Sequence, residues 1–156
     1  MKQVEQLLLG PAEAWLDALP EYQRTAMGDL LDSLEIEEAV AAWMTIGSPT
    51  DTAPFGGVKS AARLLFSNVL IEIQKLLCGD PSYKNERDRL QQGAGVSRIA
   101  VITAISSAIG PHLGASAVFI LPVVAVAMSL LVKAGQKTVC EGLDLIISDR
   151  SNKESL

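Results

Sequence analysis

The chain has 156 residues, enough for one domain or at most two, and a composition that argues against wholesale disorder. Hydrophobic residues make up 49% and aromatic residues only 4%. The apolar residues are therefore mainly Ala, Leu, Ile and Val, of which Ala and Leu favour helices. The net charge of −5 argues against a nucleic-acid binder, which carries a basic surface. We expect an all-α protein, a bundle of about five to seven helices with a hydrophobic C-terminal helical hairpin.

The net charge hides an uneven distribution along the chain. Residues 1–57 carry two basic and ten acidic side chains, residues 58–98 carry seven basic and four acidic, and residues 99–156 carry four of each. Acidic and basic faces that pack beside each other in one fold account for this pattern. A partner that matches one of the faces accounts for it equally well.

The two cysteines, Cys78 and Cys140, indicate neither a disulfide framework nor a zinc site. They have no CxxC spacing and no His nearby, and both lie among aliphatic residues. We expect buried, inert thiols. The segment MKQVEQLLLG lacks the pattern of a secretory signal, so we expect a cytoplasmic protein, with association with a membrane as the alternative.

Residues 1–57 form an acidic region of short helices in this prediction. Pro11 and Pro20 suit the first turns of two successive helices. The segment EYQRTAMGDLLDSL is amphipathic. Its apolar stripe consists of Tyr22, Ala26, Leu30 and Leu34, and Met27 and Leu31 widen it.

The next helix is expected to begin in the segment EIEE and to end at Gly47. Acidic side chains in the first turn are favoured by the helix dipole and are more often helix-stabilising charges than cation ligands. The segment that follows, GSPTDTAPFGG, is a loop, either a hinge or an ordinary connection.

Residues 58–150 are expected to form a helical core that, with residues 1–57, makes one domain and ends in a frayed tail at 151–156. The segment 58–78 has the strongest helical periodicity. Gly79 is expected to end that helix, and Asp80 to cap the next one. Two charged surfaces of these regions are candidate partner-binding sites: Glu35, Glu37 and Glu38 on the acidic side, and Lys59 and Arg63 on the basic side.

The most informative stretch runs from Ile99 to Val132, where no Asp, Glu, Lys or Arg occurs. The Gly-Pro of GPHLG predicts a turn, so we expect an apolar hairpin over residues 96–134. Its tip would consist of Gly110, Pro111, His112 and Gly114. Protonation of a histidine at the tip would oppose insertion of the hairpin into a membrane as the pH falls through about 6–7.

The second arm of the hairpin, ASAVFILPVVAVAMSLLVK, is apolar on all sides. Such a helix is either the central core helix of a bundle or a membrane span, and its uncharged part of about 18 residues just suffices to cross a bilayer. The first arm is too short to cross alone, so insertion would be re-entrant. The residues that would face a second copy or lipid are Ala100, Ala104, Ala108, Phe119, Pro122 and Val124.

No pattern of catalytic residues stands out in the sequence. No phosphate-binding loop, nucleophile elbow or calcium-loop spacing occurs, and the single histidine lies in the predicted turn. We therefore expect a protein that is not an enzyme and has no cofactor. The first hypothesis is a subunit, adaptor or inhibitor that contacts a protein partner and self-associates. The second is a membrane-active effector of a bacterial toxin or defence system whose 99–132 hairpin inserts into the bilayer.

Overall fold

The computed structural model describes residues 6–47, 57–93, 97–135 and 138–154, with side chains in narrower ranges near the gaps. All regular structure in these ranges is helical, which confirms the all-α prediction. Eight α-helices occur there, slightly more than predicted. The elements are α2 (Glu13–Asp17), α3 (Glu21–Ser33), α4 (Ile36–Gly47), α5 (Gly57–Leu77), the 3-10 turn η1 (Pro81–Tyr83), α6 (Lys84–Gly93), α7 (Arg98–Leu113), α8 (Ala117–Ala134) and α9 (Val139–Glu154).

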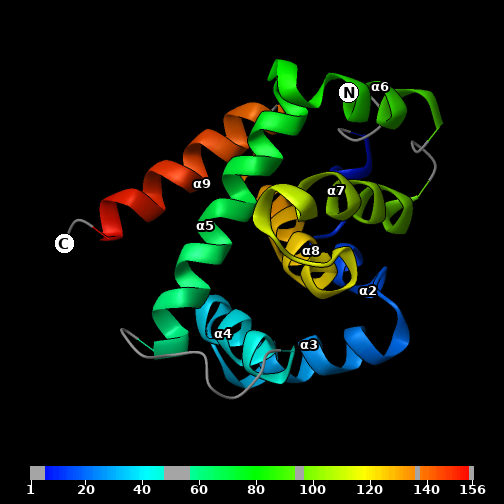
Figure 1. Ribbon diagram of the computed structural model, residues 1–156. Helices are drawn as coiled ribbons and strands as arrows, with labels where there is room; N and C mark the ends of the chain where they lie inside the picture. Colours follow the sequence, from blue (N-terminus) through cyan, green and yellow to red (C-terminus); the bar gives the residue numbers. More distant parts are fainter. Residues whose placement is uncertain (1–5, 48–56, 94–96, 136–137, 155–156) are drawn as a thin grey trace.

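Helix α8 lies at the centre of the fold, and the other helices are arranged around it (Figure 1). It contacts α2, α3, α4, α5, α7 and α9. The ten consecutive residues Ile120–Ser129 are all buried, so every face of this part of the helix is covered. A helix that is apolar on all sides needs such an environment.

The apolar stretch forms two successive helices, α7 and α8, that pack against each other, which supports the predicted hairpin in part; the turn between them lies later than expected. Helix α7 runs on through Gly110, Pro111 and His112 to Leu113, so these three predicted tip residues form its last turn. The turn itself centres on Gly114, which has a φ of +67°, a conformation that favours glycine.

Close packing at this turn also explains why residue 110 is a glycine. The backbone N–H of Ala115 donates to the carbonyl of Gly110 at 3.1 Å. A Cβ on Gly110 would lie 2.8 Å from the Ala115 carbonyl oxygen, closer than van der Waals contact permits. The Gly110-Pro111 pair therefore marks the closely packed end of α7 and not the turn itself. The proline is accommodated inside the last turn of the helix.

Pro122 interrupts the hydrogen bonding of α8 from within, because proline has no N–H to donate to the carbonyl four residues earlier. That carbonyl belongs to Val118, and it accepts a hydrogen bond from Nε2 of the buried Gln23 at 3.0 Å. The carbonyl of the next residue, Phe119, accepts one from the indole of Trp43 at 2.8 Å. Side chains of α3 and α4 thus satisfy this end of α8 and tie the N-terminal region to the hairpin.

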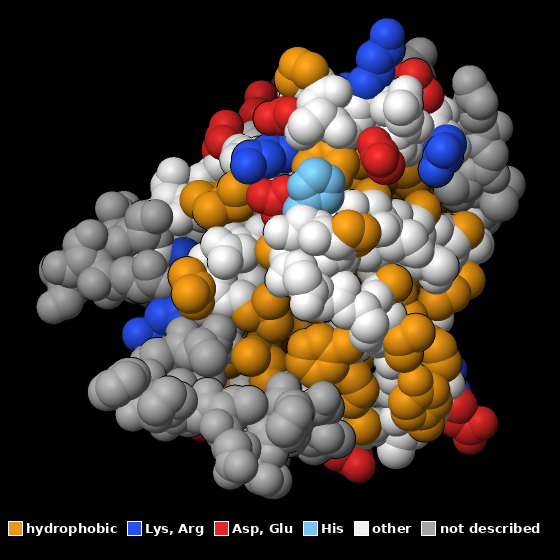
Figure 2. All heavy atoms as spheres, in the orientation of Figure 1, with side chains coloured by type: hydrophobic (Ala, Val, Ile, Leu, Met, Phe, Trp, Pro, Cys, Tyr) orange, Lys and Arg blue, Asp and Glu red, His pale blue; other side chains and the backbone are white. Residues whose placement is uncertain are grey.

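The buried face of α3 keeps the predicted stripe except at its start. Met27 is buried, and Ala26, Leu30, Leu31 and Leu34 pack against the core. Tyr22, however, is 63% exposed, and Gln23 is buried in its place. The bond from Gln23 to Val118 joins two helices that are distant in sequence, so hydrophobic periodicity cannot show it. Figure 2 shows hydrophobic side chains gathered on the face where α3, α4 and the start of α8 meet.

The two cysteines form a disulfide, so the prediction of buried, inert thiols is wrong. Cys78 directly follows α5 and is exposed, and Cys140 lies in the first turn of α9. Their Cα atoms are 5.8 Å apart although the residues are separated by 62 positions in sequence. No local spacing indicates such a bond, because the packing of α9 against α5 brings the two ends together.

Helix α9 runs on into the segment 151–156 that was predicted as a tail. Its backbone is helical as far as Glu154. Its half-buried Ile146 and Ile147 pack against the core, and Arg150 is largely buried. The C-terminal part of the chain therefore contributes to the folded surface described next.

Candidate partner-binding groove

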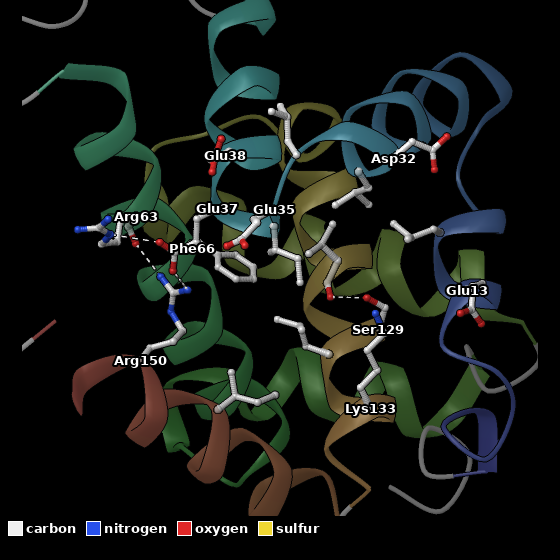
Figure 3. A pocket seen from close by; sticks show the side chains of 18 of the residues that line it. Glu13, Asp32, Glu35, Glu37, Glu38, Arg63, Phe66, Ser129, Lys133 and Arg150 are labelled. Atoms are coloured by element: carbon white, nitrogen blue, oxygen red, sulfur yellow. Dashed lines mark hydrogen bonds and ion pairs between the residues drawn. The ribbon is translucent and has the colours of Figure 1, made fainter. Parts of the chain in front are cut away.

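A groove of about 1090 Å³ opens between the N-terminal helices and α5, α8 and α9. Figure 3 shows α8 running along its floor. Among the described residues of α6 and α7, none lines the groove. The described lining residues are Glu13, Leu16, Asp17, Arg24, Gly28, Leu31, Asp32, Leu34, Glu35, Ile36, Glu37, Glu38, Arg63, Phe66, Val126, Ser129, Leu130, Lys133, Ile146, Asp149 and Arg150.

The floor of the groove is apolar and partly accessible. Leu31, Leu34, Leu130 and Ile146 are half-buried side chains that pack against the core on one side and line the groove on the other. The hydroxyl of Ser129, within this floor, donates to the carbonyl of Val126 at 2.8 Å. That bond satisfies the hydroxyl within its own helix, so the floor presents little polarity of its own.

One wall of the groove is held together by a cluster around Arg150. This side chain is 13% exposed and forms an ion pair with Glu37, and Glu37 also accepts from Nε of Arg63 at 3.2 Å (Figure 3). Nη2 of Arg150 donates to the hydroxyl of Ser67 at 3.2 Å, and the guanidinium lies 4.8 Å from the ring centre of Phe66. The cluster joins α4, α5 and α9, and its three charged side chains, Glu37, Arg63 and Arg150, leave a net charge of +1.

The remaining wall, formed by α2, α3 and the start of α4, is acidic, and at its α4 end Glu35 lies close to Glu37 and Phe66 of the Arg150 cluster (Figure 3). Its one basic side chain, Arg24, donates to the backbone carbonyl of Asp17. The acids of this wall form no ion pair within the described part of the chain. They are Glu13, Asp17, Asp32, Glu35 and Glu38. Their charges are therefore available to a molecule in the groove.

The predicted partner-binding residues are brought together only in part. Glu35, Glu37, Glu38 and Arg63 all line the groove, but Glu37 and Arg63 bind each other instead of forming two separate surfaces. Lys59 lies in the first turn of α5, and its side chain is outside the described part of the chain.

Sequence reasoning missed the contribution of the C-terminal helices to this site. Arg150 and Lys133 line the groove, and neither was a candidate. The sequence around Arg150 carries no clear amphipathic pattern that would have indicated its role. Nothing local connects it with Glu37, which lies 113 residues earlier.

The residues predicted to face a second copy or lipid differ in their environments. Pro122 and Val124 are buried in the core of this conformation. Phe119 is half-buried, and its ring stacks on that of Trp43 with centroids 6.3 Å apart. The alanine stripe, Ala100, Ala104 and Ala108, is half-buried at the edge of the buried face of α7.

The histidine predicted at the hairpin tip, His112, contacts a buried side chain of η1. The exposed His112 packs its ring 4.7 Å from that of the buried Tyr83 in η1. The Tyr83 hydroxyl donates to Glu72 at 2.6 Å. Burial, together with this hydrogen bond to a carboxylate, raises the pKa of Tyr83 well above its usual value.

Asp80 caps the start of η1, as predicted for the element that follows Gly79. Its carboxylate accepts from the backbone N–H of Ser82 at 2.9 Å and from the Ser82 hydroxyl at 2.6 Å. These hydrogen bonds lower the pKa of Asp80. They belong to the start of η1, away from the groove.

Two further properties bear on the kind of site. Among the described residues, no three His, Cys, Asp or Glu side chains are grouped in a way that could hold a metal ion. The segment Ala117–Ala134 is long and apolar enough to cross a membrane, with a mean hydropathy of 2.4, and 61% of it is buried inside the fold.

Comparison of the chain with protein-family models, with curated proteins and with solved structures gave no match.

Proposed function

We propose that the protein is a non-enzymatic interaction protein, a subunit, adaptor or inhibitor, that binds a protein partner in the groove. The observation that supports this proposal is the combination of a partly accessible apolar floor with a charged rim. Protein interfaces have this arrangement of an apolar centre and a polar rim. The volume of about 1090 Å³ exceeds that of most small-molecule pockets, which hold about 300–1,000 Å³, and suits a polypeptide segment.

Site-specific photo-crosslinking in cells that produce the protein tests this proposal. A photoreactive residue replaces Leu31 in the groove, and in a matched control it replaces the exposed Thr25 on the same helix, outside the groove. The proposal expects a discrete adduct with another polypeptide from position 31 and none from position 25. Equal adducts at both positions, or none at position 31, would contradict it.

Insertion of the hairpin into a membrane is the second candidate function, supported by the length and hydropathy of α8. It requires α8 to leave its present contacts, since its residues Ile120–Ser129 are buried on all faces. Alkaline washing of the membrane fraction tests this candidate. Retention of the protein in the washed membranes favours the effector function, and its release favours the interaction protein.

The disulfide bears on the compartment in which either function is exerted. Disulfides persist mainly in oxidising compartments. The Cys78–Cys140 bond therefore supports a location outside the reducing cytosol, against the cytoplasmic expectation. Mass spectrometry of the protein after thiol alkylation in intact cells tests this point, because a reduced pair would carry two alkyl groups.

A further inference from the structure

The groove has a charge imbalance that indicates the chemistry of its partner. Seven acidic and four basic side chains line it, a formal balance of −3. Glu37 is already paired with Arg63 and Arg150, so the imbalance is concentrated on the wall formed by α2, α3 and the start of α4. A ligand that pairs with this wall must carry positive charge.

The floor adds an apolar requirement. It presents Leu31, Leu34, Leu130 and Ile146 between the walls, and Figure 3 shows α5 and α9 on one side of α8 and α2 and α3 on the other. An amphipathic helix fills such a groove with apolar residues spaced at i, i+3, i+4 and i+7. No strand edge is offered within the described ranges, so pairing of a strand with the backbone is not the mode of binding.

We propose that the groove binds an amphipathic helix of a partner protein whose apolar face is flanked by Lys and Arg. This inference rests on the proposed function and specifies its partner. The apolar face lies on the floor, and the basic flank lies against the acidic wall, where Asp32 and Glu35 are exposed. Lys133, at the far end of the floor from α4, favours an acidic or C-terminal group of the bound helix at that end (Figure 3).

Binding of designed peptides to the full chain tests the inference. The probe is a helical peptide of about 18 residues, five turns, with Leu at i, i+3, i+4 and i+7 and Lys along the one flank that would face the acidic wall. The control peptide has Glu in place of every Lys. We expect the Lys peptide to bind at least about tenfold more tightly, with NMR shift changes at Leu31, Leu130 and Ile146. Equal affinities, or shift changes confined to other surfaces, would overturn the inference.

Paired charge variants separate groove binding from general attraction to an acidic protein. The double variant Asp32→Asn with Glu35→Gln removes two charges from the groove wall. The control, Glu21→Gln with Asp29→Asn, removes two charges from residues of α3 that do not line the groove. We expect the first pair to weaken the Lys peptide about tenfold and the second to change it less than about twofold. Equal weakening by both pairs would mean that the peptide senses only net charge.

Gly28 offers a blocking variant that does not disturb the fold. It lies on α3 and lines the groove, and a Cβ placed on it meets no atom within 4 Å. Gly28→Arg fills the groove and repels a basic helix, whereas Gly28→Ala adds only a methyl group. Both changes favour a helical backbone. Loss of Lys-peptide binding by Gly28→Arg and its retention by Gly28→Ala are expected, and full binding to Gly28→Arg would overturn the inference.

Other occupants give different results in the same measurements. Shift changes at Leu31 and Leu130 on raising the protein concentration alone would assign the groove to a second copy of the chain. Shift changes there with vesicles of anionic phospholipid would assign it to a lipid. Failure of the Lys peptide while the cross-link at position 31 persists would overturn the basic helix and leave the proposed function standing. Absence of that cross-link would count against the proposed function itself.

Discussion

The two halves of α8 have similarly apolar sequences and different surroundings. In the first half, Gln23 and Trp43 reach from α3 and α4 to the carbonyls of Val118 and Phe119, so two backbone carbonyls of this half are bonded to side chains of neighbouring helices. In the second half, Leu130 lies on the floor of a groove whose walls stand apart. Hydropathy alone does not distinguish these halves, because what covers each is decided by helices far away in the sequence.

The largest expected effect separates the halves directly. Val124→Glu places a charge where the side chain is 0% exposed and no partner is available, which should cost several kcal/mol and unfold the protein, whose stability is about 5–15 kcal/mol in total. Leu130→Glu lets the carboxylate project into the groove and should cost about 1–2 kcal/mol. Circular dichroism and chemical denaturation of both variants compare the costs. Intact N-terminal helices in Val124→Glu would instead favour the membrane effector.

Loss of the disulfide is the next largest effect. Replacing Cys78 and Cys140 with Ser frees a loop of 62 residues in the unfolded chain, which should lower the free energy of unfolding by about 4 kcal/mol. Denaturation of the wild type with and without reductant measures this change, and the double variant should be indifferent to reductant. Because α9 lines the groove, we expect loss of the disulfide to loosen the groove before it affects the part of the fold around Gln23.

The hydrogen bond to Val118 can be tested by a double-mutant cycle. Gln23→Leu removes the donor that replaces the N–H missing at Pro122, and Pro122→Ala restores a backbone donor for the same carbonyl. We expect Gln23→Leu to cost about 1 kcal/mol more in the wild-type background than in Pro122→Ala, as measured by equilibrium denaturation. Additive effects would show that Gln23 does not serve the carbonyl freed by Pro122.

The smallest effect concerns alkaline pH and lies outside both halves of α8. The folded state raises the pKa of Tyr83 above the unfolded value of about 10, so it favours the neutral phenol. This contribution is fully present below pH 10 and is lost as the pH rises above it. Tyr83→Phe should lose up to about 1 kcal/mol at neutral pH and show a shallower decline above pH 10. An unchanged alkaline decline would exclude Tyr83 as its source, and groove binding should be unaffected.

Helices with strong local patterns were predictable, and their partners were not. The periodicity of residues 58–78 predicted a helix that the structure has as Gly57–Leu77, and Asp80 caps η1 as expected. The stripe on α3 was wrong at Tyr22, because the helix buries Gln23 instead, whose hydrogen-bond partner Val118 lies in another helix. The disulfide was missed for a similar reason, since its two cysteines are joined only through the packing of α9 on α5.

Only the acidic residues of the candidate site could be predicted from the sequence. The acidic cluster at Glu35–Glu38 stands out in the sequence, and it does line the groove. Its counterpart, Arg150, belonged to a segment expected to be close to a frayed end. A pairing between Glu37 and Arg150 exists only because three helices converge, so no window of the sequence contains it.

The sequence by itself determined the all-helical class, the apolar character of residues 99–132 and the acidic character of the N-terminal region. These properties follow from local propensity, periodicity and composition, which act over a few turns of chain. The tertiary structure decided which face of each helix is buried, which charges are paired and which remain free, and which half of α8 is open. These depend on contacts between residues distant in sequence, whose energies arise only when the helices pack together.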